Sequence, residues 1–204
     1  MRISVSIILL AVWMPSLSAQ QSRLPLKEAQ GYAKVCVEQI GNPYNGPLNS
    51  EVDVSKPCAE LGEGGGAMVI PEKTLSKKLL QNVGKQPVVI GQLWLRKWAL
   101  VADGKVVPRE KLNVVTITIE DKNRPMPLLT LAVRSKNKKK KVLELLLFSE
   151  SKKPLQVIGL APDNIIQDLP LEIEWKRGEK QHDPLTLRIL GRYQTVLHIT
   201  RAGR

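Results

Sequence analysis

Apolar and polar residues alternate one by one through much of the chain after Gln86, and this period restricts the fold more than any other feature. In 171–175, leucine, isoleucine and tryptophan alternate with two glutamates, and 115–120, 185–189 and 193–199 repeat the pattern. Successive side chains of a strand point to opposite faces, so this period is typical of strands with one buried and one wet face. The sequence therefore predicts a mainly β fold.

Short turn-forming sequences separate several of these segments and predict hairpins. Asp103-Gly104 and Gly191-Arg192 suit tight turns, and the lysine-rich 135–141 joins 128–134 to 142–148. Antiparallel strands need only short connections, whereas parallel strands need long crossovers. We therefore expect an antiparallel β-sandwich or small barrel.

The segment 20–85 has a different character, helical and then irregular. Apolar residues recur every three or four positions over 26–40, where Pro25 can open a helix and Gly41 can close it. A second helix is expected over 74–83, because apolar residues again fall on one face.

The segment 1–19 has the features of a cleavable secretory signal, with a basic residue, an apolar run over 3–13 and the small residue Ala19. Retention as an anchor is the alternative, but a spanning helix needs about 20 mostly apolar residues. We expect cleavage near Ala19 and a secreted or periplasmic protein that is not membrane-spanning afterwards. The remainder would divide into the helical segment 20–85 and a β domain over 86–204.

The two cysteines, Cys36 and Cys58, predict a disulfide, because an even pair in an exported chain is typically oxidised. The bridge would staple the helical segment by closing a loop of about 22 residues, for which the chain-entropy model gives about 3 kcal/mol. Two buried, unpaired thiols are the alternative. A redox or metal role is disfavoured because the chain has no C-x-x-C motif.

A formal net charge of +12 suggests an anionic partner, and 1–19 contributes only one of the basic residues. An exported cation of this kind meets acidic polysaccharides and anionic lipid surfaces, and salt would screen the attraction. A basic surface that serves solubility alone is the alternative. Nucleic acid is disfavoured, because Phe148 is the only phenylalanine and the basic turns contain no interleaved aromatic residues.

The densest charge lies in the expected hairpin tip, which is a candidate anion-binding site. Its lysines are Lys136, Lys138, Lys139, Lys140 and Lys141. Flexible point charges at a protruding tip can bind phosphate or sulfate groups. The same lysines can instead prevent wrong strand pairing next to the apolar segment 142–148, and we favour this structural role.

Trp94 and Trp98 form a candidate ligand platform. Strict alternation would place both rings on one strand face together with Arg96, and exposed tryptophans beside cations suit a carbohydrate or a lipid surface. The alternative, which we favour, is that both rings fill the core, because aromatic residues make up only 4% of the chain.

The glycine-rich 62–67 matches a dinucleotide fingerprint in its letters but not in its context. No strand pattern precedes it and no helix start follows it, so we predict no nucleotide cofactor. We expect a loop from Asn42 to Gly66 that ends in a flexible hinge.

Catalytic patterns are scarce. The two histidines, His182 and His198, lie near no recognised nucleophile motif, and Asp163 and Asp168 do not have the spacing of a calcium loop. The glutamates of 171–175 are expected on the wet face of a strand. No metal site or cofactor is predicted.

We therefore expect a noncatalytic binding or structural module that contacts anionic surfaces or polymers. A hydrolase whose two carboxylates meet only in the folded chain is one alternative. A subunit of a cell-envelope complex, bound to another envelope protein, is the other. The fold class by itself does not decide among them.

Overall fold

The computed structural model describes residues 22–202 except 63, 120, 138–141 and 179–181. The predicted signal segment 1–19 lies outside these residues. Within them the chain is mainly β, as predicted, and all strand pairs are antiparallel. No helix in this part of the chain is long and apolar enough to cross a membrane.

The first sheet has eight strands in the order β1-β4-β5-β6-β10-β11-β12, and β9 pairs with the far end of β10. Its strands are β1 Ser22–Arg23, β4 Cys58–Gly62, β5 Gly65–Pro71, β6 Val88–Arg96, β9 Val114–Ile119, β10 Lys122–Asn137, β11 Val142–Phe148 and β12 Gln156–Gly159.

The second sheet has six strands in the order β14-β15-β16-β7-β8, and β13 pairs with β16. Its strands are β7 Trp98–Ala102, β8 Lys105–Val106, β13 Ala161–Pro162, β14 Leu171–Trp175, β15 Asp183–Ile189 and β16 Tyr193–Arg201. The smaller elements are α1 Leu26–Ile40, α2 Lys77–Gln81, the 3-10 turn η1 Arg109–Lys111, and the hairpin of β2 Tyr44–Asn45 and β3 Asn49–Ser50.

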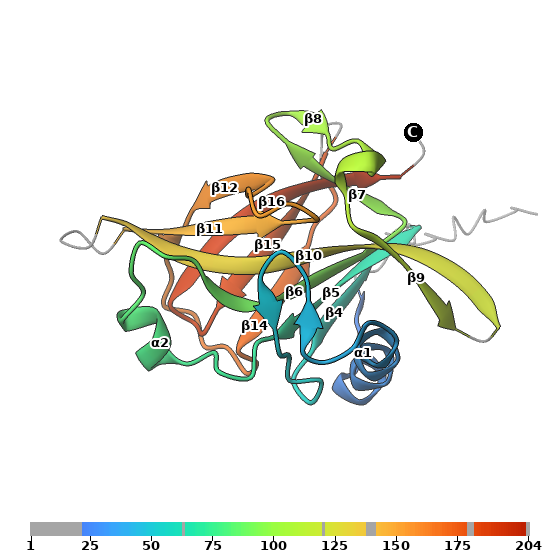
Figure 1. Cartoon of the computed structure of the whole chain (residues 1–204), viewed down its shortest axis with the longest axis horizontal. Helices are drawn as coiled ribbons and strands as arrows, with labels where there is room; N and C mark the ends of the chain where they lie inside the picture. Colours follow the sequence, from blue (N-terminus) through green and yellow to red (C-terminus); the bar gives the residue numbers. More distant parts are fainter. Residues whose placement is uncertain (1–21, 63, 120, 138–141, 179–181, 203–204) are drawn as a thin grey trace, which may run out of the picture.

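The two sheets share one apolar core (Figure 1). Leu93 and Leu131 of the first sheet belong to the same buried cluster as Ile173 and Leu187 of the second. The strand order does not close on itself in either sheet. Of the two expected architectures, a sandwich or a small barrel, the closed barrel is therefore wrong, and the antiparallel β class is confirmed.

Helix α1 covers part of the opposite face of the first sheet. Ala33 and Cys36 of the helix belong to a second buried cluster, together with Met68, Trp94 and Leu128 of the strands. The helix has the predicted bounds, with Pro25 before its first residue and Gly41 after its last. The molecule thus has three layers here, in the order helix, first sheet, second sheet.

The expected hairpins form. Asp103 and Gly104 link β7 to β8 with φ values of 50° and 72°, a left-handed pair typical of a two-residue turn. The β15–β16 hairpin turns instead on Leu190 and Gly191, with φ values of 54° and 61°. β10 and β11 pair on either side of the lysine-rich segment, as predicted.

The structure differs from the prediction between Asn42 and Gly66, where β4 and the start of β5 replace the end of the expected loop. Every residue of β5 is buried, so the strand does not alternate in the sequence and gives no period-two signal. β5 also pairs with β6, so the first sheet runs across residue 86, where we expected a new domain to begin.

Gly62 pairs with Gly65, so the described glycines of 62–67 belong to the β4–β5 strand pair and not to a hinge. A side chain at Gly65 would collide with the indole of Trp98, and a Cβ on Gly62 would stand 2.7 Å from Trp98 Cζ2. The glycines make room for this buried ring. The second helix is also shorter than expected: α2 is capped by Ser76, whose hydroxyl accepts a hydrogen bond from the backbone N–H of Leu79 at 3.2 Å.

The predicted disulfide between Cys36 and Cys58 is wrong, because both cysteines are free and buried. Cys36 lies in the cluster between α1 and the first sheet, whereas Cys58 lies in the core between the two sheets. The first sheet thus separates the two sulfurs. Of the alternatives weighed, two buried thiols is the one observed.

Candidate functional site

A groove of about 790 Å³ lies where the ends of several strands meet, and we call it the basic groove. Its walls come from the corner between β6 and β7, residues 106–109 at and after the end of β8, the start of β10 and the end of β16. These segments are far apart in the chain. Only the packing of the two sheets brings them together.

Five cationic residues line the basic groove, and no carboxylate is among the lining residues that the structure describes. The cationic residues are Arg96, Lys97, Arg109, Arg124 and Arg201. Apolar residues separate them: Val106 is 46% exposed, and Pro108, Pro125 and Pro127 also line the groove. The groove therefore combines positive charge with apolar surface.

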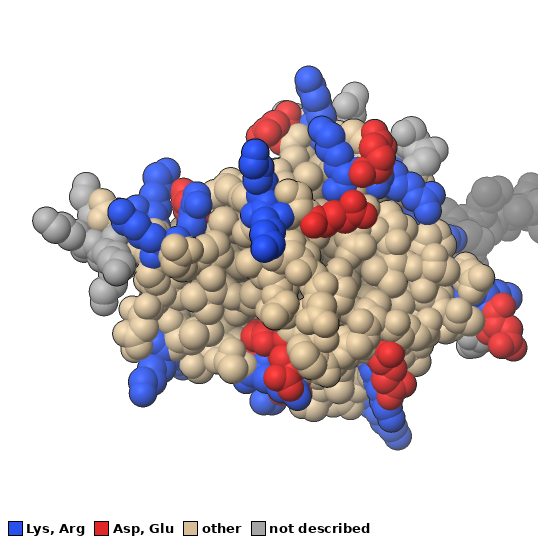
Figure 2. All heavy atoms as spheres, viewed as in Figure 1, with Lys and Arg blue, Asp and Glu red and all other residues tan. Residues whose placement is uncertain are grey.

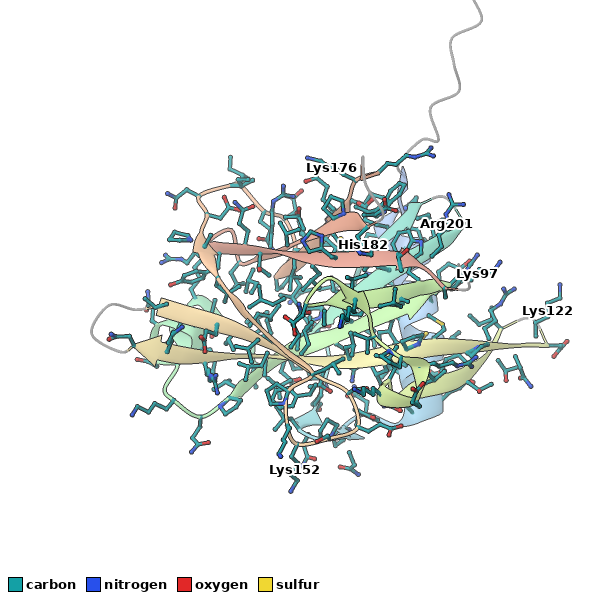
Figure 3. All side chains as sticks on the ribbon, turned by 90° about the horizontal axis from the view of Figure 1, so that it is seen from above. Lys97, Lys122, Lys152, Lys176, His182 and Arg201 are labelled. Atoms are coloured by element: carbon teal, nitrogen blue, oxygen red, sulfur yellow. The ribbon has the colours of Figure 1, made fainter. Side chains whose placement is uncertain are left out.

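The β6–β7 corner positions two of these cations. Lys97 adopts a left-handed conformation with φ of 57°, which lets the chain leave the first sheet and enter the second. The backbone N–H of Ala202 donates a hydrogen bond to the carbonyl of Lys97 at 2.9 Å, and Arg201 pairs with Trp98. Figure 3 shows Lys97 and Arg201 close together, with Lys122 farther out on β10.

Anions are the ligands that such a groove can attract. Guanidinium groups bind carboxylate, sulfate or phosphate oxygens through paired hydrogen bonds, while lysine acts as a point charge. Several like charges that line one groove sum to a field that salt screens over about 10 Å at 0.1 M. Figure 2 shows basic side chains around β7 and β8, some of them beside acidic ones, at the margin of a broad uncharged area.

Comparison with known proteins finds nothing similar. No family model matches the chain, and neither a curated protein nor a solved structure does. The functional conclusions below therefore depend on the residues and geometry of this chain alone.

Lys136, the one candidate lysine of the hairpin tip that the structure describes, does not line the basic groove. Lys136 is exposed, and its Nζ lies 3.4 Å from Oε1 of Glu144. Arg124 and Lys136 occupy opposite ends of β10, a separation of roughly 40 Å at about 3.3 Å per residue (Figure 1). The other candidate lysines, Lys138, Lys139, Lys140 and Lys141, lie outside the described residues.

The structure separates the two tryptophans of the candidate platform. Trp94 is 0% exposed beneath α1, and Trp98 is 2% exposed in the core between the sheets. Lys97 interrupts the alternation between them. The Trp98 ring stacks on Trp175 with centroids 5.6 Å apart, and the Trp94 indole N–H donates to Oε1 of Gln92 at 3.2 Å. Both rings fill the interior, which is the role that we favoured.

Glu172 is buried, not on the wet face of β14 as expected. Its Oε1 accepts hydrogen bonds from Nη2 of Arg23 at 3.0 Å and from the backbone N–H groups of Asp168 and Leu169, each at 3.1 Å. The neighbouring Glu174 is half-buried and accepts from Nη2 of Arg188 at 2.6 Å. Glu172 is buried because both faces of β14 are covered.

Glu60 lies on β4 and is also buried. Burial raises the pKa of its carboxyl to about 7, an effect that the Arg23 charge opposes and the Glu174 charge reinforces. The basic groove has no carboxylate among its described lining residues, and neither has the groove at Ile165 and Ile166 nor the cavity between α1 and the first sheet. The geometry that a carboxylate-dependent hydrolase needs is therefore not found in these grooves.

The remaining candidates do not converge on a site. Nδ1 of His182 is buried and has no hydrogen-bond partner among the described residues, whereas His198 is exposed on β16. Within the described residues no three histidine, cysteine, aspartate or glutamate side chains are placed to hold a metal ion.

A second groove, of about 730 Å³, is lined by Ile165 and Ile166, and Ile166 is 94% exposed.

The sequence reasoning missed the basic groove. Arg96 is a candidate in the sequence only through its place between the two tryptophans, and no pattern gives a role to Lys97, Arg109, Arg124 or Arg201. The adjacent pair Arg96-Lys97 at the end of an apolar strand was the one local signal. The other three cations are scattered in the sequence and become neighbours only through the fold.

Proposed function

We propose that this protein is an exported, noncatalytic module that binds anionic polymers or surfaces through the basic groove. The observation that carries the proposal is the set of five cationic residues around one groove, with no described carboxylate among them. A basic surface that served solubility alone would not need to line a concave site. The net charge of +12 adds a long-range attraction to the same partners.

The apolar part of the groove favours a ligand that is not fully hydrated. Val106 and the three prolines provide flat apolar contacts between the cations. Sugar rings have apolar faces, and acidic polysaccharides carry carboxylate or sulfate groups at regular intervals. We therefore propose an acidic polysaccharide as the first ligand to test, and an anionic lipid surface as the second.

The test is retention of the purified protein on immobilised acidic polysaccharide and on anionic vesicles, at low and high salt. The double variant Lys97→Gln/Arg124→Gln removes two charges from the groove. Lys152→Gln/Lys153→Gln removes two exposed charges elsewhere, and Figure 3 shows Lys152 at a different edge of the molecule from Lys97. We expect the groove variant to elute at clearly lower salt than both the wild type and the control variant.

Two outcomes would contradict the proposal. Equal losses in the two double variants would mean that net charge, and not the groove, causes retention. If the wild type passes through the column freely at low salt, the proposal of anion binding is wrong. A role in assembly or scaffolding then becomes the preferred proposal.

Export is part of the same proposal, and it depends on the sequence of 1–19. The intact mass of the protein recovered from a secreting host tests it. We expect a mature chain that begins at or near Gln20, and an uncleaved chain in the cytosol would contradict export.

A further inference from the structure

A narrow apolar slot lies between α1 and the outer face of the first sheet, separate from the core between the sheets. Tyr32 and Cys36 of α1 form one wall, Trp94 and Met68 lie in the strands beneath, and Met126 of β10 lies on the far side. The slot has a volume of about 80 Å³. A cavity that holds one water molecule has a volume of roughly 10–15 Å³, so this slot has room for several carbon atoms.

Arg96 is the one cationic residue among those that line the slot. It lies two residues after Trp94 on β6, so both side chains project from the same face of the sheet. Its Nε is buried, and no hydrogen-bond acceptor reaches it within the described part of the chain. A buried donor of a charged group without a partner is costly, and such groups are normally paired.

The apolar slot and the unpaired donor together restrict the chemistry of a ligand that would fit there. Apolar walls would exclude a fully hydrated ion, and a single cation would not favour a neutral hydrocarbon. A short aliphatic chain that ends in a carboxylate satisfies both, because the chain fills the slot and the carboxylate accepts from the guanidinium. We infer that this slot binds a small aliphatic carboxylate, with Arg96 as its counter-ion.

This inference goes beyond the proposed function. The basic groove would bind a large anion at the surface, whereas the slot would enclose the apolar part of a small one. Arg96 touches both cavities, so a polymer in the groove and a carboxylate in the slot would compete for it.

The test is a titration of the full mature protein with hexanoate, followed by the NMR signals of the indole N–H groups. Trp94 lines the slot, whereas Trp175 lies in the core between the sheets, lines neither cavity and serves as the internal reference. We expect hexanoate to shift the Trp94 signal and to leave the Trp175 signal in place. The neutral analogue hexanol should bind more weakly.

Two variants separate the role of Arg96 from general effects of charge. Arg96→Met keeps an apolar stem and should weaken hexanoate binding by about tenfold, to the level of hexanol. Lys97→Met removes the same charge one residue later and should leave hexanoate binding unchanged. If Arg96→Met does not fold, Leu61→Trp offers a second route, because this bulkier side chain at a lining position should block the slot.

Three results would overturn the inference. These are an unchanged Trp94 signal at millimolar hexanoate, equal affinity for hexanoate and hexanol, and equal losses in Arg96→Met and Lys97→Met. None of them bears on the proposed function, because polysaccharide retention is tested with Lys97 and Arg124. Failure of that retention test would likewise leave the slot unaffected.

Discussion

The backbone N–H of Ile173 donates a hydrogen bond to the thiol sulfur of Cys58 over 3.5 Å, although the two residues belong to different sheets. Ile173 lies on β14, which forms one edge of the second sheet. An edge strand presents unpaired backbone groups that favour aggregation unless something covers them. Here β4 of the first sheet packs against this edge, and the thiol takes the place of a neighbouring strand.

The first prediction concerns the two thiols. Reductant should leave the urea midpoint of unfolding unchanged, whereas loss of the expected disulfide would have cost about 3 kcal/mol. Burial raises the pKa of the Cys36 thiol to about 12 and also raises that of Cys58, so neither forms a reactive thiolate in the folded protein. A thiol reagent should therefore count two thiols after unfolding and almost none before. A reductant-sensitive midpoint would contradict this.

The second prediction concerns Glu60 and pH. In the folded protein the Glu60 carboxyl stays protonated up to about pH 7, whereas in the unfolded chain it loses its proton near pH 4.5. The folded state thus binds more protons between these values, so the Glu60 contribution is present below pH 4.5 and is lost as the pH rises through 7. The free energy of unfolding of Glu60→Gln should equal that of the wild type at low pH. Above pH 7 it should be larger than that of the wild type by up to about 3 kcal/mol.

Chemical unfolding of both proteins across this pH range measures the difference. The exposed Glu38 on α1 provides the matched control, and Glu38→Gln should show no comparable dependence. A constant difference between Glu60→Gln and the wild type at all pH values would contradict the proposed burial effect.

The third prediction separates two roles of Glu172. Glu172→Ala leaves the N–H groups of Asp168 and Leu169 without their acceptor and should destabilise the fold by about 2–4 kcal/mol. Arg23→Met keeps both backbone contacts and removes the arginine charge, whose side chain is 43% exposed, and should cost less than about 1 kcal/mol at pH 5, where Glu60 is protonated. Urea unfolding of the two variants checks this order. Equal costs would mean that the ion pair, and not the backbone contacts, explains the buried carboxylate.

The fourth prediction compares two glycines. A Cβ at Gly91 would collide with the carbonyl oxygen of Ile70 and stand 2.8 Å from Cδ1 of Leu171, so Gly91→Ala must push two packed strands apart. Gly104 also has a positive φ, of 72°, but open space around it. Gly91→Ala should cost more than about 2 kcal/mol, and Gly104→Ala only about 1 kcal/mol of backbone strain. Similar thermal stabilities of the two variants would contradict the close approach at Gly91.

Local periodicity was sufficient to predict the position of a helix or strand wherever that element has one wet face. Helix α1 was predicted over its observed bounds, and β16 was placed correctly from the alternation in 193–199. Periodicity did not predict β5, because all its residues are buried and none of them needs to be polar. It also failed at Lys97, where a single left-handed residue sends Trp94 and Trp98 into different cores.

The sequence by itself determined the β class, the antiparallel hairpins, the first helix and the excess of positive charge. These depend on residues that are close in the chain, where side-chain direction follows directly from position. Only the tertiary structure decided that Cys36 and Cys58 lie on opposite sides of a sheet, that Glu172 is buried, and that Lys97, Arg124 and Arg201 share a groove. Such relations depend on which face of one strand meets another, and no local period contains that information.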